Sequence, residues 1–156
     1  MSRRRRPIKR ELLKDPKYNS IVLSKFINSV MTRGKKSLAE KIVYGALDII
    51  KEKSDIDPLD VFTDAIGNVK PMVKVLSKRI GGSSYQVPVE VSSKNAQAMA
   101  FRWIISFSRK RNENSMKERL AGELLAAYKK EGASIKRRED THKMAEANKA
   151  FAHMRW

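Results

Sequence analysis

Positive charge is laid out unevenly along this sequence, and that layout constrains the fold more than any other feature. The 156 residues include 34 lysines and arginines against 17 acidic residues, which gives a formal net charge of +17. Residues 1–10 hold cations and no acid, whereas acids predominate in residues 48–64. Because like charges repel, a surface of this kind opposes compaction of the chain. Solubility alone needs a far smaller net charge, so we expect this chain to meet a dense polyanion that neutralises it.

The apolar content is sufficient for one folded domain. Hydrophobic residues make up 41% of the chain, which is below the usual globular share but well above that of a disordered segment. One domain is the default at this length, and a chain of this size can bury its own core. We expect a single domain over 1–156. It divides into a basic flexible arm, helices one to three, a hairpin, helices four to six and a tail, over 1–18, 19–71, 72–91, 92–149 and 150–156.

Apolar residues recur with a helical period in the first half of the chain. Asn19 or Ser20 is a candidate N-cap for the first helix, and Ser37 with Glu40 fits a capping box for the second. Asp57, followed by proline, is a start signal for the third, and Gly67 weakens its end. The three expected helices cover about 20–32, 36–53 and from Pro58 to before Pro71.

The apolar period changes to two after residue 72, as is typical of strands. The alternating runs 73–80 and 85–91 flank Gly81–Ser84, which predicts a β-hairpin with a glycine-rich tip. Since Pro88 has no N–H to donate, its strand leaves a free edge. An isolated two-stranded hairpin is marginal in water, so this one must pack on the helices or against a partner.

Helical periodicity returns in the second half of the chain. Ser92 or Ser93 can open a fourth helix, Ser115 with Glu118 gives a capping box for a fifth, and Ser134 can cap a sixth. The expected helices cover about 92–111, 115 to before Gly132, and 134–149. The fold class is therefore mainly α: a six-helix bundle with a protruding two-stranded antiparallel hairpin and a basic N-terminal arm.

Signals for catalysis are poor. The chain has no cysteine, and His142 and His153 are too far apart to share a helical turn, so we expect no metal site and no cofactor. Gly34-Lys35-Lys36-Ser37 lacks the glycine and hydroxyl spacing of a phosphate loop. No apolar run reaches the roughly 18 residues of a membrane span. We expect neither an enzyme nor a small-molecule substrate, and a location in the cytoplasm or, for an organellar gene, the organelle matrix.

Signals for polyanion binding are rich, because clusters of cations fall on several different elements. This distribution argues against a single helix in a DNA groove and favours a broad face that fits a folded RNA by shape and phosphate position. The acidic stretch 48–64 is expected to face away from the RNA. The candidate RNA-binding residues are Arg3, Arg4, Arg5, Arg6, Lys9, Arg10, Lys25, Arg33, Lys35, Lys36, Lys74, Lys78, Arg79, Arg102, Arg109, Lys110, Arg111, Lys117, Arg119, Lys136, Arg137 and Arg138.

Two alternatives compete with this hypothesis. A helical DNA-binding module would also be strongly basic, and competition between duplex DNA and a folded RNA separates the two. An RNA-modifying enzyme would need a cofactor loop, a metal cluster or a nucleophile–base pair, none of which the sequence offers. Tyr85 and Trp156 are aromatic residues placed outside the expected core, where they could stack on bases.

Several strings in the chain resemble the family of small-subunit ribosomal protein seven, of the bacterial and organellar type. The resemblance extends over about the whole chain, in order. The strings are Val43-Tyr44-Gly45-Ala46-Leu47, Asn68-Val69-Lys70-Pro71-Met72-Val73, Gly81-Gly82 followed by Tyr85-Gln86-Val87-Pro88-Val89-Glu90-Val91, Arg119-Leu120-Ala121-Gly122-Glu123-Leu124-Leu125, and 142–153, which begins His142-Lys143-Met144-Ala145.

The resemblance implies six helices with an extended β-ribbon and a structural role in the small ribosomal subunit. Family members bind the small-subunit ribosomal RNA directly, nucleate assembly of the subunit head and lie near the exit-site transfer RNA. Their C-terminal region also meets a neighbouring ribosomal protein. On this sequence the resemblance implies that the residues near transfer RNA are Gly81, Gly82, Tyr85, Lys143 and Lys149.

Overall fold

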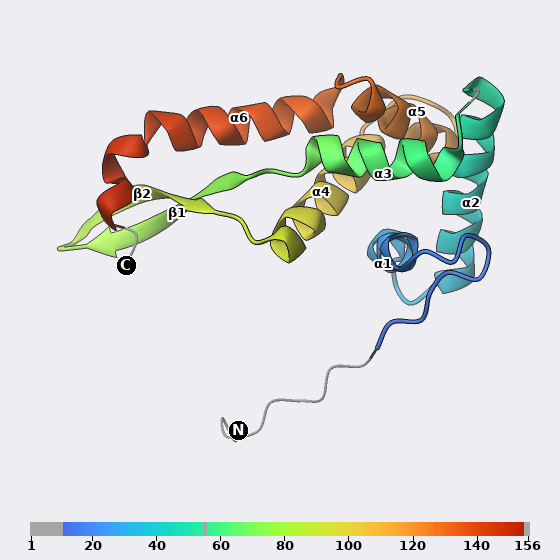
Figure 1. The fold of residues 1–156 in the computed structure, drawn as a ribbon, viewed down its shortest axis with the longest axis horizontal. Helices are drawn as coiled ribbons and strands as arrows, with labels where there is room; N and C mark the ends of the chain where they lie inside the picture. The colour runs from blue at the N-terminus through green and yellow to red at the C-terminus, as the bar shows by residue number, and fades with distance from the viewer. Residues whose placement is uncertain (1–10, 55, 155–156) are drawn as a thin grey trace.

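The structure is a computed structural model that describes residues 11–54 and 56–154. Helices dominate it, and one two-stranded hairpin extends from the helical body (Figure 1). This confirms the predicted fold class. In the described residues the elements are α1 (Ile21–Val30), α2 (Lys36–Lys53), α3 (Pro58–Val69), β1 (Val73–Ile80), β2 (Ser83–Glu90), α4 (Ser93–Ser108), α5 (Met116–Tyr128), α6 (Ala133–Ala147) and a short 3-10 helix, η1 (Lys149–Met154).

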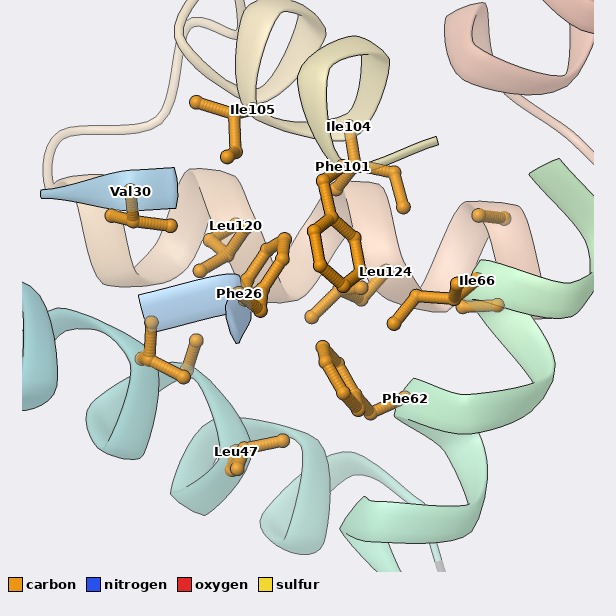
Figure 2. Packing of buried hydrophobic residues seen from close by; sticks show 14 of the residues in the cluster. Phe26, Val30, Leu47, Phe62, Ile66, Phe101, Ile104, Ile105, Leu120 and Leu124 are labelled. Carbon is orange, nitrogen blue, oxygen red and sulfur yellow. The ribbon is translucent and has the colours of Figure 1, made fainter. Parts of the chain in front are cut away.

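The core lies where α1, α2, α3, α4 and α5 meet (Figure 2). Phe26 of α1 contacts both Phe62 of α3 and Phe101 of α4 edge to face, with ring centroids 5.2 Å apart in each pair. Leu120 and Leu124 of α5 are buried against them. Each such side chain contributes roughly 1.5–3 kcal/mol by leaving water. This core holds the helices together against the repulsion of the surface charge.

Side-chain caps explain where several helices begin. Ser20 accepts a hydrogen bond from the Leu23 N–H, and Asp57 accepts one from the Leu59 N–H. Both halves of the capping box form between Ser115 and Glu118 at α5. These three start signals are confirmed.

Two predicted caps are wrong. The N-cap of α2 is Lys35, which makes no side-chain cap, so the expected box between Ser37 and Glu40 does not form. The N-cap of α6 is Gly132, which has a φ of 90° that suits glycine. Ser134 lies inside α6 and is buried, and its hydroxyl donates to the Glu123 carboxylate of α5.

One helix ends earlier than the sequence predicted. Helix α4 ends at Ser108 and not near residue 111. The Ser108 hydroxyl donates to the Ile105 carbonyl, and the Lys110 N–H donates to the Phe107 carbonyl, so the chain tightens into a turn there. Helix α3 does continue through Gly67 to Val69.

The hairpin turn is tighter than the sequence predicted. Ser83 and Ser84 pair with Ile80 and Arg79, so β2 begins at Ser83 and only Gly81-Gly82 connects the strands. Both glycines have positive φ, at 56° and 89°. A two-residue hairpin turn requires such backbone angles, which glycine adopts at little cost.

The hairpin is supported along its length by the C-terminal part of the chain. Helix α6 runs beside it and contacts both strands, and η1 packs on β2 (Figure 1). Tyr85 of β2 contacts Phe151 of η1, with ring centroids 5.5 Å apart. Of the two alternatives expected for the hairpin, packing on helices is the one that the structure shows.

The segment before α1 is anchored on α2. Asp15 is only 4% exposed and accepts a hydrogen bond of 2.6 Å from the Tyr44 hydroxyl. Its other oxygen accepts the backbone N–H groups of Lys17 and Tyr18. The predicted arm extended to residue 18, but from Asp15 onward the chain is packed against the body. Its first ten residues lie outside the described part.

Candidate nucleic-acid interface

A groove of about 790 Å³ lies between α1 and α4. Among the described residues, five cations and no acidic residue line it. The cations are Lys25 of α1, Lys94, Arg102 and Arg109 of α4, and Lys110 just after α4. A concave surface of this kind concentrates positive potential and attracts polyanions.

Helical spacing places the cations on the rim of the groove and apolar groups on its floor. Arg102 and Arg109 are seven residues apart, which is about two turns, so both point to the same side of α4. Phe101 and Ile105 also line the groove, although they are only 4% and 6% exposed. Helix α4 therefore supplies part of the core and the groove with neighbouring faces.

Four predicted RNA-binding residues come together in this groove: Lys25, Arg102, Arg109 and Lys110. Sequence reasoning missed Lys94, which also lines it. The signal was present, because Lys94 precedes Arg102 by eight residues, a little over two turns, and so borders the same face of α4. Leu12 was also missed, since nothing in the sequence near residue 12 predicted a contact with α4.

Two of the predicted RNA-binding cations, Arg111 and Arg119, bond to other groups of the same chain. Arg111 pairs with Glu113 at 2.8 Å and with Glu123 at 3.2 Å. Burial alone would lower the pKa of the Arg111 guanidinium, but the hydrogen bonds to these two carboxylates outweigh it and raise that pKa. The side chain of Arg119 donates to the Glu113 carbonyl at 2.6 Å. These groups hold the α4–α5 connection as well as carrying charge.

Two more predicted cations are bonded to backbone carbonyls of other elements. Arg138 of α6 donates to the Asn68 carbonyl at the end of α3, and Lys78 Nζ lies 3.2 Å from the Met154 carbonyl. Lys74 is half-buried, while Arg79 is exposed near the hairpin tip. Of the hairpin residues, Arg79 is therefore the one best placed to reach a partner.

The remaining predicted cations lie outside the groove. Arg33, Lys35 and Lys36 are exposed around the α1–α2 turn, where Lys36 lies 3.8 Å from Glu40. Lys117 is exposed at the start of α5. The exposed cations of α6 are Lys136, Arg137 and Lys143, and this helix is well separated from α1 in Figure 1. The arm cations Arg3 to Arg10, and Trp156, fall outside the described residues.

The residues predicted to lie near transfer RNA are grouped around the hairpin and the C-terminal elements. Gly81 and Gly82 are exposed at the hairpin tip, and Lys143 and Lys149 are exposed on α6 and η1. Tyr85 is half-buried against Phe151, so part of its ring is covered.

Other kinds of site are not evident in the described ranges. No three histidine, aspartate or glutamate side chains there are grouped so that they could hold a metal ion. No described helix combines the length and the apolarity needed to cross a bilayer. Acidic side chains near the end of α2 and from the N-cap of α3 onward are exposed, and none of them lines the groove. They are Asp48, Glu52, Asp57, Asp60 and Asp64.

The fold and the groove define a basic, mainly helical class of protein organised around a charged surface. Comparison with known proteins makes this specific. Residues 2–149 match the family described as ribosomal protein S7p/S5e. The chain is 58% identical to small ribosomal subunit protein uS7 of Granulibacter bethesdensis, 58% to that of Syntrophobacter fumaroxidans and 56% to that of Cellvibrio japonicus, each over the full length of both chains.

The chain therefore belongs to the ribosomal protein S7p/S5e family. This confirms the resemblance found in the sequence strings. Membership makes the chain a structural ribosomal protein and not an enzyme.

Proposed function

We propose that this protein binds small-subunit ribosomal RNA through the α1–α4 groove, the hairpin and the basic arm, and so nucleates assembly of the subunit head. One observation carries the proposal: five cations converge on a groove that no acidic residue of the described ranges lines. Phosphate contacts position a protein on nucleic acid and supply most of its electrostatic affinity. A folded RNA also presents phosphates in several directions, which suits cations on separate elements.

The hairpin tip and the C-terminal elements suit a second RNA neighbour. We propose that exit-site transfer RNA lies near Gly81, Gly82, Tyr85, Lys143 and Lys149, and that the C-terminal region meets a neighbouring small-subunit protein. Support comes from the packing of η1 and α6 on the hairpin, which keeps together the elements that carry these residues. The corresponding location is the ribosome, in the cytoplasm or an organelle matrix.

The test is the salt dependence of binding to a folded RNA from the subunit head. If six to ten phosphates are contacted, affinity should fall about a thousandfold or more between low and moderate salt, with the slope for duplex DNA as a guide. Replacing Arg102 and Arg109 with Gln should weaken binding and flatten that slope. A matched control, Lys51→Gln with Lys53→Gln, removes the same charge from the exposed end of α2 and should change binding little.

Competition separates this function from that of a DNA-binding module. Duplex DNA should displace the RNA only at far higher concentration. Equal displacement by both competitors, or affinity that does not respond to salt, would contradict the proposal.

A further inference from the structure

We propose that the α1–α4 groove receives the base of one unpaired nucleotide, while the cations on its rim hold the neighbouring phosphates. This inference rests on the RNA-binding function proposed above and specifies what the groove takes. It starts from the shape of the site. Contacts to phosphates alone need only a convex or flat basic surface, whereas this surface is hollowed to about 790 Å³. Pockets that enclose small organic groups measure about 300–1,000 Å³.

The floor of the groove is apolar. Phe101 and Ile105 line it although both are largely buried in the core. Ala98 also lines the groove and is exposed to solvent. Leu12 lines the groove from the segment before α1 and is 46% exposed. Bases have apolar faces, so burying one against these side chains is favourable. A phosphate group would gain nothing from such a floor.

The walls carry groups that can bond to the edge of a base. Asn28 of α1, Gln97 of α4 and Ser106 of α4 line the groove. Asn28 and Ser106 are exposed, and Gln97 is half-buried. A carboxamide offers both a donor and an acceptor, as base edges do. Sequence-specific recognition of RNA mostly uses unpaired bases bonded in this way.

Charge identifies the occupant as a nucleotide within RNA. Lys25, Lys94, Arg102, Arg109 and Lys110 would repel the chain's own arm, whose sequence over 1–10 has cations and no acid. The same cations attract the phosphates on each side of an inserted base. A continuous A-form duplex does not fit, because its bases remain stacked and paired and cannot enter a hollow.

Filling the groove tests the proposal without changing its charge. Ala98→Phe places a ring in the hollow and leaves all five cations, and the exposed position on α4 tolerates it at small cost in helix stability. The matched control is Ala147→Phe, the same substitution at an exposed site on α6. Ala98→Phe should weaken binding to the folded head RNA by about tenfold, the order of effect expected when one base loses its apolar contacts with the groove. The salt slope and the affinity for an uninterrupted RNA duplex should stay the same, and the control should bind like the native protein.

Abasic nucleotides then identify the inserted base. Each unpaired position of the RNA is replaced in turn by an abasic residue, and binding is measured with the native protein and with Ala98→Phe. At one position, the abasic replacement should weaken RNA binding by the native protein and leave binding by the Ala98→Phe protein unchanged. The reason is that the substitution and the abasic replacement remove the same contact. The inference is overturned if Ala98→Phe binds normally, if it loses affinity equally for duplex RNA, or if no abasic position behaves non-additively. Failure of the RNA-binding function would look different, since the native protein itself would then lack salt-dependent affinity for the folded RNA.

Discussion

Arg111 in the α4–α5 connection and Glu123 on α5 form an ion pair of 3.2 Å, although Glu123 is only 1% exposed. The other Glu123 oxygen accepts both the N–H and the hydroxyl of Ser134 at the start of α6, at 3.1 and 2.6 Å. One buried carboxylate therefore ties α5 to the chain segments on both sides of it. A buried charge is tolerated only when its partners are present.

Arg111→Ala should destabilise the protein by about 2–4 kcal/mol, because it leaves the Glu123 carboxylate buried with only the Ser134 donors. Urea unfolding followed by circular dichroism measures the loss. RNA affinity of the folded variant should fall less than it does for Arg102→Gln, since the Arg111 guanidinium is already held by two carboxylates. Unchanged stability together with a large loss of RNA binding would contradict this view of Arg111.

Gly122 gives Arg111 the space that it occupies. A Cβ atom at Gly122 would lie 2.9 Å from Arg111 Nη2, closer than such atoms approach in practice. In an ordinary helix Gly→Ala stabilises by about 1 kcal/mol. We expect Gly122→Ala to destabilise this protein instead, because the guanidinium is fixed by its ion pairs. In an Arg111→Ala background the same change should become stabilising. Thermal unfolding of both single variants and the double variant forms the cycle, and additive effects would disprove the steric explanation.

Tyr44→Phe should release the segment that precedes α1. The hydroxyl donates to Asp15 at 2.6 Å, and a hydrogen bond to a charged group contributes about 1.5–3 kcal/mol. Burial, together with the bond to Asp15, raises the pKa of the Tyr44 phenol far above its ordinary value of about 10. The protonated Tyr44 phenol therefore contributes its full share of the free energy of unfolding below pH 10. That contribution is lost as the pH rises toward the folded-state pKa. Unfolding at pH 8 to 11 measures this. The native protein should lose more stability than Tyr44→Phe over that range, and parallel losses would show that this phenol is not responsible.

His142→Gln should make the junction of α6 and the hairpin insensitive to mild acid. His142 Nε2 accepts the Met72 N–H at 3.1 Å, which requires the proton to be on Nδ1. Burial, and then the positive charge of Arg138, lower the pKa of the imidazole. The neutral His142 imidazole thus contributes to the free energy of unfolding above about pH 6.5. That contribution is lost as the pH falls through the folded-state pKa. Hydrogen exchange at the Met72 amide should accelerate between pH 7 and pH 5, after correction for intrinsic rates. A glutamine can accept the same bond without titrating, so the variant should show no such change. Equal acceleration in both proteins would refute the role of His142.

The sequence predicted the helices and the hairpin well because those signals are local. The pattern of apolar residues in α1, the Asp57 cap and the capping box at Ser115 depend on neighbours a few residues away. The absence of an α2 side-chain cap and the role of Ser134 could not be predicted in this way. Ser134 resembles an N-cap locally, but its hydroxyl is bound to Glu123, a residue of another helix.

The site shows the same division between local and long-range information. Arg102 and Arg109 could be placed on one face of α4 from their spacing alone. That Lys25 of α1 faces them across a groove depends on how α1 packs on α4 through Phe26 and Phe101. The internal roles of Arg111 and Arg138 depend on partners 12 and 70 residues away, which no pattern of charge reveals.

Two neighbouring cations of the hairpin, Lys78 and Arg79, differ in their surroundings. Arg79 is exposed, whereas Lys78 Nζ donates to the Met154 carbonyl in η1. Arg79→Ala should weaken binding to the folded RNA, lower the salt slope by about 1 and leave thermal unfolding nearly unchanged. Lys78→Ala should also loosen η1, seen as faster hydrogen exchange at Phe151 to Met154. If Arg79→Ala lowers stability as much as it lowers affinity, the Arg79 side chain supports the fold and the hairpin is not an RNA contact. A control at Ser77, exposed on the same strand, replaces a neutral side chain with Ala and should alter neither binding nor unfolding.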